Sequence, residues 1–139
     1  MSAVDRTAVR EWLFRTQHQR LKATLAAGRA VAAPCARTDD FVADLRAVLA
    51  SRSLLAAYAN LLTELRAACD GEQEAPPIVP KPPYVTVTSL GPVLRLTRPT
   101  DRIVIRLAIR EITDDGTYEF RHLDTVQDLP EITIRTTPG

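Results

Sequence analysis

The stretch APPIVPKPPYVTVTSLGPVLRL, residues 75–96, separates two kinds of sequence pattern. Before it the chain is rich in Ala, Leu and Arg and follows a helical period, whereas after it the period is two, as in strands. Five prolines between Pro76 and Pro83 stop either pattern from crossing, because proline lacks the N–H that helices and sheets need. The sequence therefore predicts a helical region at 1–71, a proline-rich hinge at 72–83 and an antiparallel β-module at 84–139.

The composition is that of a globular protein without a strong charge preference. The chain has 139 residues, 45% of them hydrophobic and 25% charged, and a net charge of +1. This charge gives no general attraction to nucleic acid or to anionic membranes. No apolar run has the length of a membrane span, and MSAVDRTAVREW lacks the apolar core of a signal peptide. We therefore expect no membrane association and a location in the cytoplasm, or in a particle assembled there.

The two cysteines, Cys35 and Cys69, are typical of a reduced intracellular protein with small buried thiols. A disulfide between them is the alternative. The basic residues are uneven, with sixteen Arg against Lys22 and Lys81. This bias fits either a GC-rich genome or a demand for the Arg fork at interfaces and phosphates.

Residues 4–32 are predicted to be helical, with a change of apolar face near the polar run 16–20. The first face holds Val9, Trp12 and Leu13, and the second holds Phe14, Leu21, Leu25 and Ala32. The helix either bends at this point or contacts different partners at its two ends. The triplet Trp12–Phe14 spreads over more than half the circumference, which indicates a contact with another subunit. The alternative is that a loop or the β-module covers it.

A second helical region is predicted as two segments, 39–50 and 53–70. Thr38 has the position of an N-cap, and Asp39 and Asp40 follow in the first turn, where the helix dipole favours negative charge. Adjacent helical residues point about 100° apart, so this acidic pair indicates capping rather than a metal site. Gly71 has the position of a C-terminal cap.

Within 53–70, apolar residues recur at the spacing of a helix pair, which fits a core or an interface between subunits. Together with the first helix, this stripe forms the predicted oligomer interface. Its residues are Val9, Trp12, Leu13, Phe14, Leu54, Tyr58, Leu61 and Leu65.

Five strand candidates follow the prolines. They are Tyr84–Ser89, Val93–Arg98, Ile103–Ile112, Thr117–His122 and Glu131–Thr136. Turn residues separate them, and Asp115-Gly116 is a hairpin signal rather than a calcium site. We therefore expect the α+β class: an N-terminal helical hairpin or three-helix unit followed by a small antiparallel β-sandwich or open barrel.

The outward face of these strands carries more basic than acidic residues. Its arginines are Arg95, Arg106, Arg110, Arg121 and Arg135. They are candidate contacts for a nucleic-acid backbone. Single-strand binders add aromatic side chains for base stacking, however, and here only Tyr84 has outward parity.

No catalytic or cofactor motif is present. His18 and His122 have no Cys, His or carboxylate at ligand spacing. A phosphate-binding glycine loop, the dinucleotide fingerprint and the nucleophile elbow are missing. We therefore predict that the protein is not an enzyme and that it has no cofactor and no metal site.

The segment KPPYVTVTSLGPVLR, Lys81 to Arg95, resembles a stretch in small uncharacterised proteins of halophilic archaea. The similarity covers the proline hinge and the first two predicted strands. It implies an intracellular protein that is not secreted, and no activity. The near-neutral charge of this chain departs from the acidic composition of proteins from such hosts.

These observations favour a structural or adaptor subunit that self-associates or joins a larger assembly. The main reason is apolar helical surface that one small core does not cover, since such surface usually marks a contact. Nucleic-acid binding through the arginine-bearing sheet face is the alternative.

Overall fold

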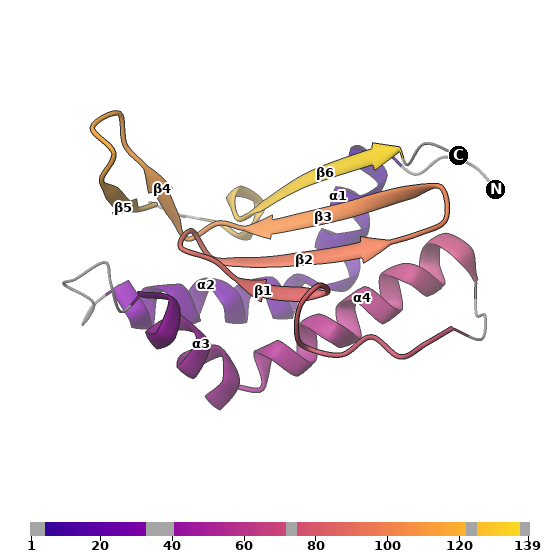
Figure 1. Cartoon of the computed structure of the whole chain (residues 1–139), viewed down its shortest axis with the longest axis horizontal. Helices are drawn as coiled ribbons and strands as arrows, with labels where there is room; N and C mark the ends of the chain where they lie inside the picture. The colour runs from indigo at the N-terminus through magenta and orange to yellow at the C-terminus, as the bar shows by residue number, and fades with distance from the viewer. Residues whose placement is uncertain (1–4, 33–40, 72–74, 122–124, 137–139) are drawn as a thin grey trace.

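The computed structural model describes residues 5–32, 41–71, 75–121 and 125–136. In this part of the chain four helices come first: α1 (Arg6–Thr16), α2 (His18–Ala32), α3 (Phe41–Ser51) and α4 (Leu54–Asp70). All strands follow them, and the helices gather on one side of the larger sheet (Figure 1). The α+β class, with helices before antiparallel strands, is confirmed.

The described strands form two separate antiparallel sheets. The larger sheet has the order β1 (Val85–Val87), β2 (Pro92–Thr97), β3 (Asp101–Leu107) and β6 (Pro130–Thr136). The smaller one is a hairpin of β4 (Arg110–Ile112) and β5 (Tyr118–Phe120), and a short 3-10 helix, η1 (Val126–Asp128), precedes β6.

The strand predicted at 103–112 is interrupted. The N–H groups of Ile109 and Arg110 both donate to the carbonyl of Leu90, at 2.7 and 3.0 Å, and this directs the chain out of the large sheet into the hairpin. The strands therefore do not close into the sandwich or barrel expected from the sequence. Helices with apolar stripes bury the inner sheet face instead of a second sheet.

The Asp115-Gly116 hairpin turn is confirmed. Its ladder continues from Thr113 N–H, which donates to the carbonyl of Thr117 at 2.8 Å. The hydroxyls of Thr113 and Thr117 donate to the Asp115 carboxylate and hold its pKa below the ordinary value. The acidic side chain therefore has a role in closing the turn.

The bend near residues 16–20, one of the two alternatives left open by the sequence, and the predicted break between residues 50 and 53 are both present. Gln17 ends α1, where its N–H donates to the carbonyl of Leu13 at 2.8 Å, and α2 begins at the next residue. Arg52 and Ser53 separate α3 from α4, and Ser53 has a φ of 59° without a side-chain cap bond. Gly71 ends α4 with a φ of 77°, as predicted. Cys35, Thr38, Asp39 and Asp40 lie outside the described residues.

One core joins the helical region to the strands. Tyr58 of α4 is fully buried, and its hydroxyl lies 2.6 Å from the hydroxyl of Thr24 on α2. The single Thr24 proton is directed to the carbonyl of Arg20, so Tyr58 is the donor of this pair. Burial raises the pKa of Tyr58 above its ordinary value of 10.0. Because helices and sheet bury one another, the two predicted regions share a single core.

The proline segment contacts this core rather than spanning open space. Ile78 is buried and belongs to the core cluster. The Arg66 guanidinium of α4 donates to the carbonyl of Pro76 at 3.0 Å. The described prolines thus connect α4 to β1 along the surface of the molecule.

A buried arginine links α4 to the turn between β2 and β3. The side chain of Arg98 is 1% exposed, and its guanidinium lies 3.3 Å from the Asp70 carboxylate and 3.5 Å from that of Asp101. Removing one partner of a buried ion pair is strongly destabilising. The neighbouring Cys69 is half-buried, and desolvation raises the pKa of its thiol.

Gly91 provides a test of the turn between β1 and β2. A Cβ at this position would lie 2.3 Å from the carbonyl oxygen of Leu107, and its φ is +146°. We expect Gly91→Ala to lower the free energy of unfolding in urea by about 3 kcal/mol or more, since backbone strain and a backbone clash add together. Gly116→Ala is the matched control, because Gly116 has a φ of +84° and open space around it. It should cost only about 1 kcal/mol, and equal losses for the two variants would contradict the clash.

Candidate functional site

The described residues contain no group of three or more His, Cys, Asp or Glu side chains that could hold a metal ion. None of the helices in the described ranges is long and apolar enough to cross a bilayer. His18 is exposed on α2, and His122 lies outside the described residues. The absence of enzymatic activity stays a prediction. The features that the structure does describe are surfaces through which the chain could bind a partner.

The predicted helical interface has to be corrected. Six of its eight residues have at most 4% of their surface exposed within the single chain and belong to its core. These six are Val9, Leu13, Leu54, Tyr58, Leu61 and Leu65. Trp12 and Phe14 are half-buried and pack against the same core. The guanidinium of Arg10 lies 4.8 Å from the centre of the Phe14 ring.

The two helix breaks are the physical reason why the residues of the predicted interface are buried. The changes of apolar face predict surface without a partner, but the chain turns at Gln17 and at Arg52–Ser53. Each turn redirects the following helix, so that its stripe also points at the core. The buried Leu13 before the first break and the buried Leu21 after it illustrate this. Apolar surface on the helices is therefore used inside one chain.

The predicted arginine face is only partly present. Arg95, Arg106 and Arg135 lie on the outer face of the large sheet, half-buried or exposed. Arg102, which the sequence pattern did not predict, is exposed on the same face and lies directly opposite Arg135 in the β3–β6 register. It was missed because the strand was expected to begin at Ile103, and the period-two pattern extended backwards would have found it.

Arg121 and Arg110 do not belong to this face. Arg121 is half-buried and donates to the carbonyls of Ala108 and Asp128, each at 3.0 Å. It therefore connects the end of β5 to the segment before β6.

Arg110 is 3% exposed and lies inside the protein, where it cannot contact a nucleic-acid backbone. Its guanidinium is 3.6 Å from the centre of the Phe41 ring and 4.3 Å from that of Tyr118. Its Nε donates to the carbonyl of Ser89 at 2.8 Å. An arginine between aromatic rings stabilises the packing through cation–π attraction. It thus attaches the β4–β5 hairpin to α3.

The long edge of the large sheet is the most distinctive surface that remains. β6 is the last strand in the sheet order, and among the residues that the structure describes all seven of its residues pair with β3 alone. Figure 1 shows β6 along the border of the sheet, with α1 crossing behind it. Helices contact both edge strands, α3 and α4 at β1 and α1 at β6, but β1 has three residues and β6 has seven. Only β6 therefore offers a long row of edge N–H and C=O groups among the described strands.

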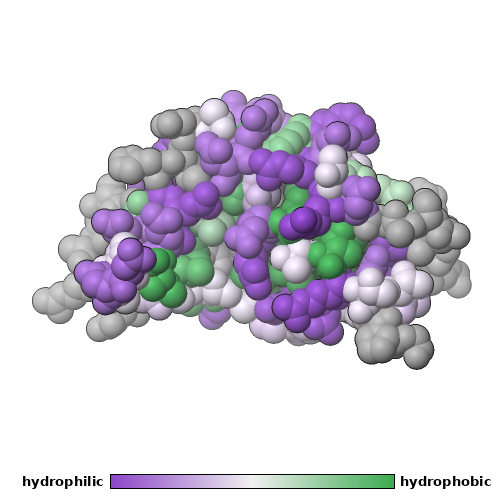
Figure 2. Space-filling view, turned by 90° about the horizontal axis from the view of Figure 1, so that it is seen from above, coloured by the Kyte–Doolittle hydropathy of each residue, from purple (hydrophilic) through white to green (hydrophobic). Residues whose placement is uncertain are grey.

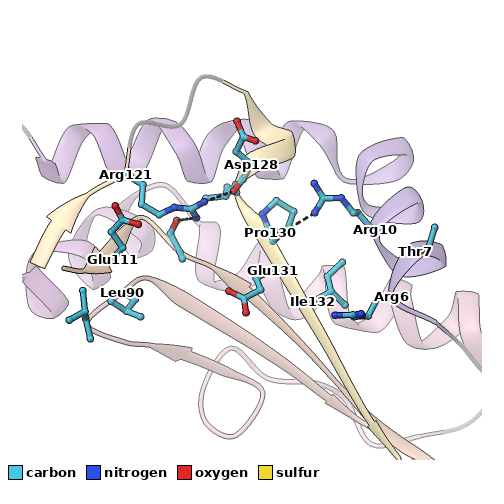
Figure 3. Close-up of a pocket in the computed structure, with 13 residues that line it drawn as sticks. Arg6, Thr7, Arg10, Leu90, Glu111, Arg121, Asp128, Pro130, Glu131 and Ile132 are labelled. Atoms are coloured by element: carbon cyan, nitrogen blue, oxygen red, sulfur yellow. Dashed lines mark hydrogen bonds between the residues drawn. The ribbon is translucent and has the colours of Figure 1, made fainter. Parts of the chain in front are cut away.

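A pocket of about 730 Å³ adjoins the first residues of β6, between α1 and β4. Arg10 of α1 reaches the carbonyls of Pro130 and Gln127, at 3.1 and 2.5 Å, while Glu131 and Ile132 point to opposite sides of β6 (Figure 3). Its charged side chains balance: Arg6, Arg10 and Arg121 against Glu111, Asp128 and Glu131. This balance gives the pocket no preference for an anion.

The molecular face above β6 and the hairpin is mixed in character. Figure 2, seen from above, shows mostly hydrophilic residues with hydrophobic groups between them. Among the described residues, Ile112 of β4 is the large hydrophobic side chain with the greatest exposure, at 57%. Contacts on this side would therefore be partly polar.

The fold places the chain in the α+β class of proteins, as a domain with helices on one face of an open antiparallel sheet. The model of a family described as a domain of unknown function, DUF7988, matches residues 7–135, and the chain belongs to this family. No curated protein and no solved structure matches the chain.

The Arg110 contacts predict a specific loss. We expect Arg110→Lys to lower the free energy of unfolding by about 2 kcal/mol, because lysine keeps the charge but loses the planar stacking and the Nε donor. Arg102→Lys, on the exposed outer face, should change it by less than about 0.5 kcal/mol. Urea titrations of both variants measure the difference. An unchanged midpoint for Arg110→Lys would show that its stacking does not hold the hairpin.

Proposed function

We propose that this chain is a non-enzymatic structural or adaptor subunit that assembles through the open edge of β6. The observation that carries the proposal is this edge: it is seven residues long, pairs only with β3 within the described part of the chain, and bears charges of both signs. Strand addition at a sheet edge is a common way for proteins to associate, since main-chain hydrogen bonds supply affinity. The proposal replaces the helical interface expected from the sequence, because six of the eight residues of that interface are buried in the core of the single chain.

Two features limit where a new strand would pair. Pro130 begins β6 and has no N–H, and its carbonyl already accepts a bond from Arg10. The available segment is therefore 131–136, whose side chains alternate between the two faces of the sheet. Such an assembly is expected in the cytoplasm or in a particle formed there.

Proline substitutions on β6 test the proposal. N–H groups alternate in direction along an antiparallel strand, so either Thr133 or Ile134 donates away from β3. We expect the wild-type chain, of 15.3 kDa, to have a multiple of this mass in light scattering at micromolar concentration. Proline at the outward residue should give a folded monomer, whereas proline at the inward residue should unfold the protein.

Thr133→Ala and Ile134→Ala serve as controls, because they keep both N–H groups and should keep the assembled mass. Circular dichroism melting separates loss of association from loss of folding. A wild-type monomer at concentrations up to about 100 μM would contradict the proposal. So would a folded proline variant at each position that still assembles.

Nucleic-acid binding is the second candidate. The outer sheet face carries Arg95, Arg102, Arg106 and Arg135 against the single acid Glu131. Arginines on one face can neutralise phosphates whatever the base sequence. Its aromatic complement is small, since Tyr84 is half-buried beside β2.

This candidate predicts retention on heparin at low salt, and binding to single- or double-stranded DNA that weakens steeply as salt rises. Arg102→Glu should reduce the retention, whereas Arg46→Glu, on the exposed side of α3, should not. Passage through heparin without retention would remove nucleic acid as a partner.

A further inference from the structure

We infer that the partner at the β6 edge is a second copy of this chain, paired antiparallel about a two-fold axis at Thr133. This inference rests on the proposed function and names the partner and the register. It follows from the charges of β6, their neighbours within the chain, and the symmetry of its sequence.

Of the two charged residues of β6, Glu131 lies opposite a residue of opposite charge within the chain, and Arg135 lies opposite a residue of like charge. Glu131 lies opposite Arg106, and the two side chains form an exposed ion pair at 3.8 Å. Arg135 lies directly opposite Arg102 instead. Like charges opposite each other on neighbouring strands are destabilising. An acid brought to the free side of Arg135 would therefore relieve a repulsion already present in the sheet.

The segment 131–135, Glu-Ile-Thr-Ile-Arg, is complementary to itself when reversed. With Thr133 on the axis, Glu131 of each copy faces the partner subunit's Arg135. Ile132 of each copy also faces the partner's Ile134 across the axis. Thr133 faces the partner's Thr133. Opposite charges, β-branched pairs and threonine pairs are the cross-strand combinations that stabilise antiparallel sheets.

Other registers lose this match. A slip of two residues in either direction from the Thr133 axis leaves Glu131 or Arg135 opposite threonine. A slip of four brings Glu131 or Arg135 against its own copy. A slip of one residue sets the isoleucines against the charged face, because successive side chains point to opposite sides. The complementary register is therefore specified by the side chains.

The two faces of the joined strands would remain consistent with the fold. Ile132 is buried and Ile134 half-buried on the helix-covered side, so their cross-axis contacts continue the core. Glu131, Thr133 and Arg135 lie on the open side. The symmetric pairing uses the same edge in both copies and leaves no further β6 edge, so it closes at a dimer.

A cysteine on the axis tests the register directly. Directly opposite residues in an antiparallel pair have Cα atoms about 4.5–5.5 Å apart, which suits a disulfide. In a Cys35→Ser, Cys69→Ser background, Thr133→Cys should form a disulfide-linked dimer under mild oxidation, reversed by dithiothreitol. Thr97→Cys is the control, because Thr97 is exposed on the same face of the sheet but lies on β2. It should run as a monomer in denaturing electrophoresis without a reducing agent. Equal crosslinking of the two variants would overturn the register.

Charge reversal tests the Glu131–Arg135 contact without relying on chemistry at the axis. Glu131→Arg and Arg135→Glu each make two like-charged contacts in a homodimer, and we expect each to raise the dimer dissociation constant at least about tenfold. Mixed in equal amounts, the two variants should form a heterodimer close to wild type in affinity, because every facing pair is then of opposite charge. Glu119→Arg and Arg46→Glu make the same changes at exposed sites away from β6 and should leave the constant unchanged.

The outcomes separate this inference from the proposed function. If the wild-type chain is a dimer that a β6 proline dissociates, while Thr133→Cys does not crosslink and the mixed variants do not pair, the register is wrong and edge assembly stands. A monomeric wild-type chain removes both. Crosslinking at Thr133 together with rescue on mixing supports both.

Discussion

The inner face of the four-stranded sheet is apolar along every strand, and covering it is the constraint on which the rest of the structure depends. Leu94, Leu96, Ile103 and Ile105 are at most 1% exposed. Burying one such side chain contributes about 1.5–3 kcal/mol. The helices supply the second layer, with α1 packed at β6 and α4 at β1 and β2. This requirement explains why most apolar residues of the helices are buried, whereas Trp12 and Phe14 are half-buried.

Two buried arginines fix the β2–β3 turn and the β4–β5 hairpin to the helices. Arg98 connects the end of α4 to the β2–β3 turn through Asp70 and Asp101. Arg110 attaches the small hairpin to α3 through Phe41. The guanidinium group suits both places, because it is flat, always charged and able to stack or to donate in a fixed direction. Part of the arginine excess thus serves internal packing rather than an external ligand.

Covering one face leaves the other face and one long edge available. The outer face carries arginines around the buried valines Val93 and Val104, and the β6 edge presents backbone groups beside a pocket of balanced charge. The DUF7988 family is described only as a domain of unknown function, and the proposed assembly rests on the edge of β6. The sequence symmetry of 131–135 is the basis on which we propose a second copy of the chain as the partner at this edge.

Local sequence by itself determined the α+β order and the places where the chain turns. These places are the helix breaks at Gln17 and Arg52–Ser53, the cap at Gly71 and the hairpin at Asp115-Gly116. Helical and strand periods, turn residues and caps act over a few residues, so they can be recognised without tertiary information. Which surface each stripe meets depends on contacts between distant residues. Only the tertiary structure therefore decided that Tyr58 and Leu61 are core, that Arg110 is buried, and that residues 103–112 divide between two sheets.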